Sequence, residues 1–538
     1  MSGPWLSRAA RQRWQVPDRY NIAADVMDGQ DPAAEAMIWQ GPDGSTRRVP
    51  WRDIQRTAAQ FADLVAEQGV KPGDRVAFVL PPLPETAAMV LGAFKMGGIV
   101  VMLSSLWGRD ALRYRILDAA PAVILTDADS VATVRAAAAG TSSAVIVLSP
   151  EMFAGRPATY DTLATAADAP AMIFYTSGTT GPAKGIVQAH ASLLGHNEFR
   201  ACHDLRRGEL FHGAGDWAWS LAKIIGPWRQ GARHLVVHQG GRFDAAKLFA
   251  ALSEYQVSNV LLNPTVLRRL REAGPDAGRR FPQRFRIACC SSEPLQPELA
   301  GWFAEQFGTP LLDYYGMTES YPMLGNRPGH PFRPGSIGRP LPGWEVTLLD
   351  NRGEGVASGD VGEICLQARS NPQYPLGYWN RPEASEATFG GKWFRTGDLA
   401  SRDEEGFYWY VSRSDDVIIS AGYRIGPHDL EDVLRGHPAI AEVAVIGLPD
   451  ARRGQVVCAS VALADGWQPS DGLGREIQQY VKERYSSFAY PRVVRFVEEI
   501  PKTASNKLRR SALRAALRPA AASASTTRTT AAEQGETT

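Results

Sequence analysis

One glycine- and hydroxyl-rich segment has the composition of a phosphate-binding turn. Residues 175–185 read Tyr-Thr-Ser-Gly-Thr-Thr-Gly-Pro-Ala-Lys-Gly and follow the apolar run 171–174. Glycine lets backbone N–H groups approach an anion closely, and Lys184 adds a point charge. The segment is not a Walker A loop, because Gly185 rather than Ser or Thr follows the lysine. The alternative is a polar surface turn after a buried strand.

Five further segments place polar side chains where apolar runs end. They are residues 292–295, 313–320, 393–399, 413–426 and 501–510. Thr318 stands beside Glu319 after a glycine turn, and Asp398 ends a loop. Acceptor-only carboxylates suit hydroxyl ligands, and the fixed fork of arginine suits phosphate. Each segment alone also fits a solvated turn, a charge run or a surface salt bridge.

The elements that must position these residues alternate between strand-like and helical patterns. Between residues 50 and 150 we predict strands at 75–80, 121–126 and 143–148, and a helix at 85–96. This rhythm is typical of βαβ units and a parallel sheet. The pattern resumes later in the chain with strands at 234–237, 259–262 and 285–290 and helices at 245–255 and 266–273.

Beyond residue 335 the sequence pattern changes, which predicts a β-rich subdomain and a separate C-terminal domain. Short strands with Gly and Asp turns at 344–349, 362–366 and 406–411 predict a β-rich subdomain, and a compact α+β pattern follows at 427–485. The predicted class is therefore α/β, with a large N-terminal domain of α/β subdomains plus the β-rich subdomain, then a small α+β C-terminal domain. The predicted parts are an irregular arm at 1–20, the large domain at 21–413, the small domain at 414–518 and a disordered tail at 519–538.

The overall composition argues against several kinds of binding partner and bound metal. The 538 residues suggest about two to four domains, and the net charge of +1 calls for neither nucleic acid nor an anionic membrane. Five cysteines without C-x-x-C spacing argue against structural zinc and disulfides, which fits a reducing, cytoplasmic setting. His234 and His238 have a metal-like spacing but bracket a strand, so we expect a structural role. No apolar run approaches the roughly 18 residues of a membrane span.

In order and spacing, the six segments resemble those of AMP-forming acyl-CoA synthetases of the adenylate-forming superfamily. That superfamily includes acyl- and aryl-CoA ligases, luciferases and peptide-synthetase adenylation domains. Within it, the sequence most resembles medium-chain acyl-CoA synthetases. The likeness covers roughly residues 20–518. It implies ATP, Mg²⁺ and CoA as ligands, and a mobile C-terminal domain that rotates about a hinge at Asp415.

The resemblance assigns roles to matching positions. Thr318 would bond the α-phosphate, Glu319 would ligate Mg²⁺, and Lys507 would be the catalytic lysine that spans the acyl carboxylate and the α-phosphate. The remaining nucleotide and CoA positions are Thr176, Ser177, Gly178, Thr179, Thr180, Gly181 and Lys184 for the phosphates, Ser292, Glu293, Pro294, Asp313, Tyr314, Tyr315 and Gly316 for the adenine side, Asp398, Arg413 and Arg424 for ribose and α-phosphate, and Gly422, Tyr423 and Arg453 for CoA. Ser292 stands where relatives have glycine, so a backbone contact is expected to be rearranged.

The acid pocket is assigned in the same way. The resemblance points to Trp217, Trp219, Ser291, Gly316 and Met317. Acetyl-CoA synthetases carry tryptophan where Gly316 stands, so we expect room for a longer or branched acid. The two tryptophans fit ordinary core aromatics equally well.

Three functions follow from these patterns. The preferred one is a carboxylate–CoA ligase for a short- to medium-chain, branched or aromatic acid. The alternative is a stand-alone adenylation enzyme that loads a carrier-protein thiol, and a third is a nucleotide-binding relative without chemistry. Retention of Thr318, Glu319, Asp398 and Lys507 disfavours the third, and the absence of Gly-Lys-Ser/Thr disfavours a P-loop kinase.

Overall fold

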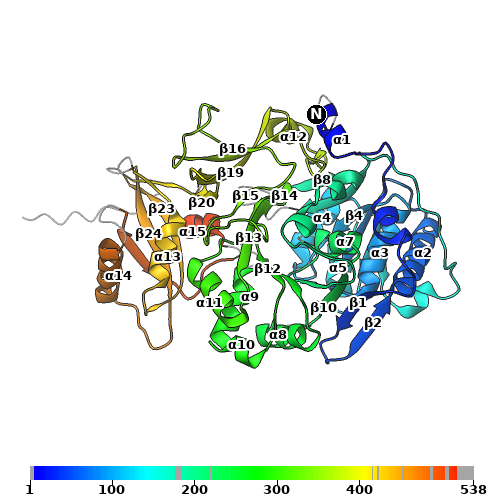
Figure 1. Cartoon of the computed structure of the whole chain (residues 1–538), viewed down its shortest axis with the longest axis horizontal. Coiled ribbons are helices and arrows are strands. Elements are labelled where there is room, and N and C mark those ends of the chain that lie inside the picture. Colours follow the sequence, from blue (N-terminus) through cyan, green and yellow to red (C-terminus); the bar gives the residue numbers. More distant parts are fainter. Residues whose placement is uncertain are drawn as a thin grey trace, which may run out of the picture. The chain divides into compact units, whose positions relative to one another are not determined.

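The computed structural model describes residues 5–175, 183–218, 221–240, 243–414, 416–420, 423–450, 454–484, 489–502 and 508–517. These residues fall into two compact units, 5–414 and 416–517. Both units mix helices and sheets (Figure 1), which confirms the predicted α/β class. Among the described residues, no helix is both long enough and apolar enough to cross a bilayer.

A seven-stranded sheet forms the first layer of the larger unit. Its strands, in spatial order, are β18 (Gly377–Tyr378), β8 (Gly185–Ala189), β7 (Pro170–Tyr175), β4 (Ile99–Met102), β3 (Arg75–Val79), β5 (Val123–Thr126) and β6 (Ala144–Val147). The run from β7 to β6 is parallel, as predicted, whereas β8 and β18 pair antiparallel at one edge. The accompanying helices are α2 (Trp51–Glu67), α3 (Pro84–Lys95), α4 (Arg109–Ala119) and α5 (Val131–Ala138). Strands β4 and β5 are buried along their whole length, as expected for a parallel sheet covered on both faces.

A nine-stranded sheet carries most of the candidate site. Its order is β15 (Arg339–Pro340), β14 (Ser320–Gly325), β13 (Leu311–Met317), β12 (Ile287–Cys290), β11 (Asn259–Leu262), β9 (Leu210–Gly213), β10 (Arg233–Val237), β1 (Glu35–Gln40) and β2 (Thr46–Pro50). Helices α8 (Ala245–Glu254), α9 (Pro264–Ala273), α10 (Ala277–Arg280) and α11 (Pro297–Phe307) gather near it (Figure 1), after α6 (Glu198–Ala201) and α7 (Ala222–Arg229) in the chain. Val260 and Ala288 face a core with Phe249 and Phe303, whereas Leu261 faces a second core. Both faces of these strands are therefore buried, and their carboxyl ends are left to present polar side chains.

The predicted β-rich subdomain is a four-stranded antiparallel sheet. Its strands are β16 (Val346–Leu349), β17 (Val361–Gln367), β19 (Trp393–Arg402) and β20 (Tyr408–Arg413), and α12 (Pro382–Phe389) precedes β19. Asp398 lies within β19, so our prediction that it ends a loop was wrong. The β19 backbone instead continues past Asp398 and pairs with β20.

The N-terminal segment differs from the irregular arm that we expected. It contains α1 (Arg8–Arg13), whose N-terminus is capped by the Ser7 hydroxyl, and Trp5 and Leu6 are buried. The short helical turn η1 (Ala24–Asp28) follows this segment, and two others, η2 (Pro150–Phe153) and η3 (His190–Gly195), lie further along the larger unit. The Ser7 cap satisfies an otherwise unpaired N–H group, and the buried aromatic ring anchors the segment.

The smaller unit is an α+β arrangement of its own. It contains β21 (Ile418–Ser420), β22 (Tyr423–Ile425), β23 (Ile440–Asp450), β24 (Gly454–Leu463), β25 (Val493–Phe496), α13 (Pro427–Arg435), α14 (Asp471–Arg484) and α15 (Arg510–Leu517). Leu430, Val445 and Ile477 meet in its core. Arg510 donates two hydrogen bonds, of 2.6 and 2.7 Å, to the buried Glu431 carboxylate and so ties α15 to α13.

Of the two histidines with metal-like spacing, His234 has the structural role that we expected. His234 is buried, and its Nε2 lies 2.9 Å from the Ile224 carbonyl oxygen. Burial lowers the pKa of His234 to about 4, so the ring stays neutral at physiological pH. Across the described part of the chain, no three potential metal-ligating side chains of the His, Cys, Asp or Glu type come together.

Candidate active site

Thr318 and Glu319 form the turn that joins β13 to β14. Met317 pairs with Ser320 across this hairpin, so the turn falls two residues later than the Gly316 position that the sequence favoured. Glu319 is only 7% exposed, and its backbone carbonyl accepts a hydrogen bond from Gln188 Nε2 at 3.3 Å. Burial raises the pKa of the Glu319 carboxyl, and the nearby Arg413 opposes that rise only in part. The carboxylate is therefore placed where a cation would stabilise its ionised form.

Tyr378 connects Glu319 to Lys184. The tyrosine hydroxyl donates to Glu319 Oε1 at 3.4 Å, and Lys184 Nζ lies over the ring, 4.9 Å from its centroid. Strand β18 places this ring, because Tyr378 pairs with Ile186 of β8. A positive and a negative side chain from distant parts of the chain are thus held around one aromatic ring.

Asp398, Arg413 and Tyr315 form a second polar group. Asp398 and Arg413 are direct partners across β19 and β20, and Arg413 Nη1 lies 3.3 Å from Asp398 Oδ1. The Tyr315 hydroxyl donates to the other oxygen, Oδ2, of the same carboxylate. Burial, and then the Asp398 charge, raise the pKa of Tyr315, so its hydroxyl remains a donor. These three residues, predicted separately, are neighbours in the structure.

The segment after β12 is the one that we expected on the adenine side of the site. Ser292 has φ of +83°, a backbone conformation that glycine adopts without strain. The sequence difference at this position therefore leaves the glycine-like backbone in place. Glu293 is anchored to α9, because Thr265 Oγ1 donates to its Oε1 at 2.7 Å and Arg268 Nη2 to its Oε2 at 2.6 Å.

The space beside Gly316 is filled, which corrects our expectation that it is open. A Cβ atom at residue 316 would lie 2.6 Å from Tyr321 Cδ2 and 3.0 Å from Pro322 Cα. Glycine is needed there because β14 approaches β13 closely. The Tyr321 hydroxyl lies 2.7 Å from Ser291 Oγ, so this ring is fixed between the two strands. Trp217 is 3% exposed and packs among core side chains.

Some predicted residues lie elsewhere or outside the described part of the chain. Tyr314 is a core residue, with its hydroxyl 3.3 Å from His203 Nε2, and Asp313 is buried beside it with a raised pKa. Residues outside the described part are Thr176, Ser177, Gly178, Thr179, Thr180, Gly181, Trp219, Gly422, Arg453 and Lys507. For Tyr423 and Arg424 the structure describes only their backbone, in β22.

The sequence reasoning missed Tyr378, Gln188 and Tyr321. Gln188 gave a faint signal, as a polar residue inside the apolar strand β8. Tyr378 and Tyr321 gave none, because their contacts with Glu319 and Ser291 join residues 59 and 30 positions apart.

Together these groups can hold a nucleotide triphosphate and a hard cation. Glu319 offers a carboxylate and Thr318 a hydroxyl, and Mg²⁺ commonly takes one or two carboxylates and completes its shell with phosphate oxygens and water. Lys184 and Arg413 carry positive charge that could meet phosphate oxygens, and Asp398 can accept two hydroxyl groups. This donor set fits Mg²⁺ bound together with ATP rather than a metal held by protein alone.

Comparison with known proteins agrees with this geometry. Residues 26–379 match the family described as AMP-binding enzyme, and residues 429–507 match the AMP-binding enzyme C-terminal domain. The chain is 31% identical to the mitochondrial acyl-coenzyme A synthetase ACSM3 of Mus musculus over 532 residues, covering 93% of this chain and 91% of that protein. It is 33% identical to the uncharacterized acyl–CoA ligase YtcI of Bacillus subtilis (strain 168) over 520 residues, covering 93% and 96% of the two chains.

Solved structures give the same picture. The anthranilate CoA ligase AuaEII in complex with anthranoyl-AMP superposes with a TM-score of 0.83 at 27% identity, covering 94% of this chain and 99% of that one. A benzoate CoA ligase from Burkholderia xenovorans LB400 has a TM-score of 0.80 at 28% identity, covering 92% and 100% of the two chains.

Proposed function

This chain belongs to the AMP-binding enzyme family and is an AMP-forming acid–CoA ligase, and we propose that the side chains around Tyr378 and Asp398 hold its ATP. ATP and CoA are its substrates, and the family requires Mg²⁺. The observation that carries the proposal is the meeting of Lys184, Glu319 and the Asp398–Arg413 pair within one unit.

The reaction has two steps. In the first, a carboxylate oxygen of the acid attacks the α-phosphorus of ATP, the bond to the β-phosphate bridging oxygen breaks, and pyrophosphate leaves. In the second, the sulfur of CoA attacks the carbonyl carbon of the acyl-adenylate, AMP leaves, and the thiol proton passes to solvent. The first step brings a carboxylate toward a triphosphate, so repulsion between negative groups must be offset.

The described residues would offset that repulsion in separate ways. Lys184 would attract the β- and γ-phosphates, and Tyr378 holds its ammonium by a cation–π contact. Arg413 would turn its guanidinium to the α-phosphate once the ribose hydroxyls bond Asp398 in its place. Glu319 and the Thr318 hydroxyl would hold Mg²⁺, which when bound neutralises phosphate charge.

For the acid we propose a short or compact substrate. The Tyr321 ring and the backbone of Pro322 fill the space next to Gly316, and Tyr321 is held by Ser291. An acid placed against Gly316 would meet this ring instead of an open tunnel. Of the short- to medium-chain, branched or aromatic acids that we expected, the short, branched and small aromatic ones are compatible with this pocket, whereas longer straight chains are disfavoured.

The experiment is an acid-dependent exchange of labelled pyrophosphate into ATP, followed by thioester formation with CoA or with a carrier protein. We expect exchange with short acids and faster AMP release when CoA is added. Faster turnover with only a carrier-protein thiol would support the alternative loading function. Formation of ADP instead of AMP would contradict both.

A single variant tests the proposed ribose contact. We expect Asp398→Asn to raise the KM for ATP about tenfold or more, because the ribose hydroxyls lose a charged acceptor. Asp403→Asn is the matched control on the same strand pair, since Asp403 accepts the Phe407 N–H at 2.8 Å in the turn between β19 and β20. Equal KM values for the two variants would remove Asp398 from the ribose site.

A further inference from the structure

A cleft of about 830 Å³ opens on the larger unit at some distance from the candidate active site. Its lining includes Arg13, Trp14, Arg200, Asp204, Arg327 and Pro342. Glu319 precedes β14 and Arg327 follows it, and the six residues of this strand extend about 20 Å. The cleft therefore lies at the opposite end of β14 from the Thr318–Glu319 turn.

The walls of the cleft are fixed by packing. A Cβ atom at Gly343, where φ is +85°, would lie 2.2 Å from the ring of Trp14, so glycine lets the indole seat directly on the backbone. The indole N–H also donates to the Ser370 carbonyl at 3.2 Å. Asn197 Nδ2 donates to the carbonyl of Pro342, the residue before Gly343. The cleft is thus formed before any ligand arrives, which reduces the entropy lost on binding.

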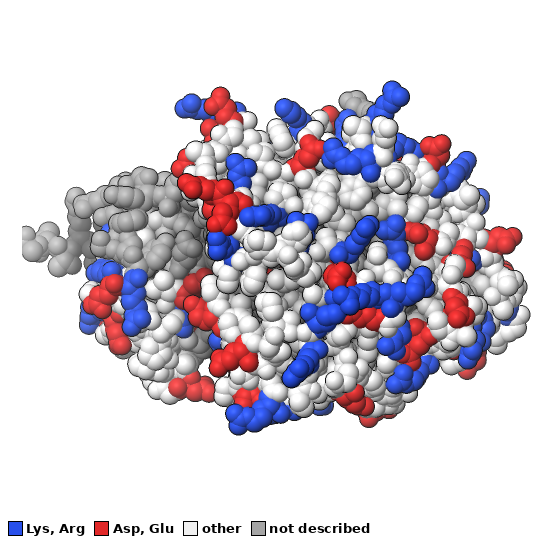
Figure 2. Space-filling view, in the orientation of Figure 1, with Lys and Arg blue, Asp and Glu red and all other residues white. Residues whose placement is uncertain are grey.

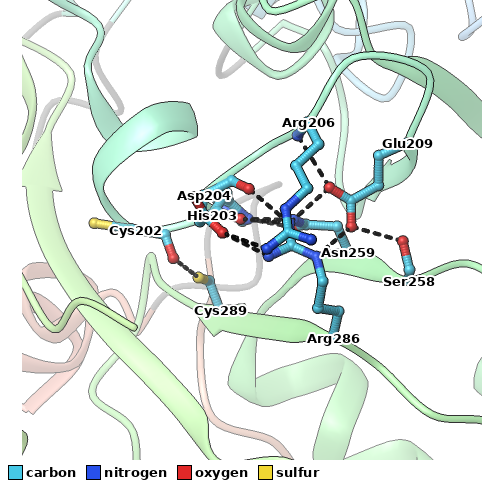
Figure 3. A network of polar contacts seen from close by, with 9 residues as sticks. All are labelled: Cys202, His203, Asp204, Arg206, Glu209, Ser258, Asn259, Arg286 and Cys289. Carbon is cyan, nitrogen blue, oxygen red and sulfur yellow. Dashed lines mark hydrogen bonds and ion pairs between the residues drawn. The ribbon is translucent and has the colours of Figure 1, made fainter. Parts of the chain in front are cut away.

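The acidic residue in the lining is already neutralised. Asp204 Oδ2 accepts Arg286 Nη1 at 2.8 Å, and Arg286 also pairs with Glu209 at 2.7 Å (Figure 3). Burial alone would raise the pKa of Glu209, but hydrogen bonds from Arg286 and Ser258 hold it below its usual value. With Arg206, the group shown in Figure 3 contains two acids and two arginines, so its charges cancel.

Among the described residues, two guanidinium groups at the cleft form no ion pair. Arg13 pairs with Glu345 at 2.9 Å, on the exposed rim. Within the described ranges of the chain, neither Arg200 nor Arg327 has an ion pair or side-chain hydrogen bond to a protein group. A cleft with two free guanidiniums and no free carboxylate in its described lining attracts anions.

The shape and remaining surface indicate what kind of anion fits. The planar fork of arginine matches phosphate oxygens, and a volume of this size suits a small molecule. Trp14, Ala201, Pro328 and Pro342 contribute apolar surface beside the two arginines. We propose that this cleft binds a small organic phosphate, whose phosphate group pairs with Arg200 and Arg327 and whose organic part rests against the apolar wall.

The test uses the full chain with its nucleotide site filled by Mg²⁺ and α,β-methylene-ATP, which cannot be cleaved at the α-phosphorus. Phenyl phosphate, inorganic phosphate and phenol are then titrated in by calorimetry. We expect one phenyl phosphate per chain, bound more tightly than either of the others. Arg200→Gln and Arg327→Gln should each weaken it about tenfold or more, because each removes a charge-assisted hydrogen bond.

The matched control is Arg271→Gln, which changes an exposed arginine of α9 outside the cleft and should bind phenyl phosphate as wild type does. Unchanged affinity in both cleft variants, no saturable binding to wild type, or equal binding of phenol and phenyl phosphate would overturn the proposal. Pyrophosphate exchange measured on the same preparations reports the ligase function separately, so failure of one proposal is distinguishable from failure of the other.

Discussion

At the scale of single residues, several positions combine an unfavourable local state with a proposed task. Ser292 adopts a glycine-like backbone angle, and Glu319 is a carboxylate with 7% exposure. Each costs free energy in the folded protein, because left-handed angles strain a side chain and burial disfavours charge. Such costs are common where a ligand must be met closely.

Replacing Ser292 with glycine should relieve the backbone strain. We expect Ser292→Gly to raise the free energy of unfolding by up to about 1 kcal/mol, with the greater flexibility of glycine in the unfolded chain offsetting part of the gain. Urea denaturation measures this change. Ser292→Ala serves as the control, because it removes the hydroxyl but keeps the Cβ atom, and a stabilisation equal to that of glycine would mean that φ is not the cause.

Glu319 should make stability depend on pH in a defined direction. Its pKa is raised by burial, so the folded protein keeps a proton that the unfolded chain, with a value near 4.5, has already released. The free energy of unfolding should therefore fall as pH rises through 4.5 toward the folded pKa. Glu319→Gln has no proton to lose, so we expect it to gain stability relative to wild type between pH 4 and pH 7 while adenylation slows.

Denaturant midpoints at the two pH values, paired with exchange rates, check the Glu319 prediction. Glu363→Gln provides the comparison, because that carboxylate of β17 forms an ion pair with Arg395, at 2.7 Å, and is not one of the residues that we propose to bind ATP or Mg²⁺. A pH-independent difference between wild type and Glu319→Gln would contradict the burial argument.

At the scale of elements, the β13–β14 hairpin brings together the proposed catalytic turn and the acid pocket. Thr318 and Glu319 occupy the turn, whereas Gly316 and Tyr321 face each other across the strands. A substitution at residue 321 can therefore reshape the pocket without changing the turn itself. The Ser291 hydroxyl, at the end of β12, holds the Tyr321 ring from the next strand.

Shortening Tyr321 should shift the preference for acids. We expect Tyr321→Ala to raise kcat/KM about tenfold or more for an acid several carbons longer than the best wild-type substrate, because even one methylene that gains room is worth a factor of this size. Tyr321→Phe keeps the ring and removes only the hydroxyl bonded to Ser291, so it should retain the wild-type length preference. A length profile that Tyr321→Ala leaves unchanged would place the acid elsewhere.

The same hairpin shows what sequence alone could and could not predict. Apolar periodicity predicted the strands at 75–80 and 259–262 and the helix at 245–255 to within one residue of β3, β11 and α8, because local pattern decides them. The turn was misplaced because Gly316 suggests a turn, whereas here glycine is required by the close approach of Pro322. Asp398 and Arg413 were found from their segments, but their pairing depends on strand register. Tyr378 and Tyr321 act through contacts that no local pattern encodes.

At the scale of the whole molecule, acidic and basic residues are nearly equal in number, so no large region of one sign is expected from the composition. Acidic and basic side chains are interspersed over the face shown in Figure 2, in agreement with the net charge of +1. Phosphate-bearing ligands must then be recognised by particular groups rather than by a general field. Arg413, Lys184 and the two cleft arginines are the groups of the larger unit that we propose for this role.

The two compact units raise the question of how one chain serves two reactions. The family resemblance assigns Lys507 to the first step only, and this residue lies outside the described part of the chain. A lysine that stabilises charge as pyrophosphate leaves has no necessary role once the acyl-adenylate exists. We therefore expect Lys507→Ala to slow adenylation by about a hundredfold or more, while CoA transfer from preformed acyl-adenylate stays near the wild-type rate.

Single-turnover measurements of the two half-reactions separate these effects. Lys502→Ala is the matched control, because that lysine precedes Lys507 in the same segment and its ammonium pairs with Glu442 at 2.5 Å. It should leave both steps unchanged, since an exposed ion pair contributes little to stability. Loss of both half-reactions to the same extent in Lys507→Ala would show that the lysine supports the fold or the acceptor step instead, and the division of labour between the two steps would then have to come from the larger unit alone.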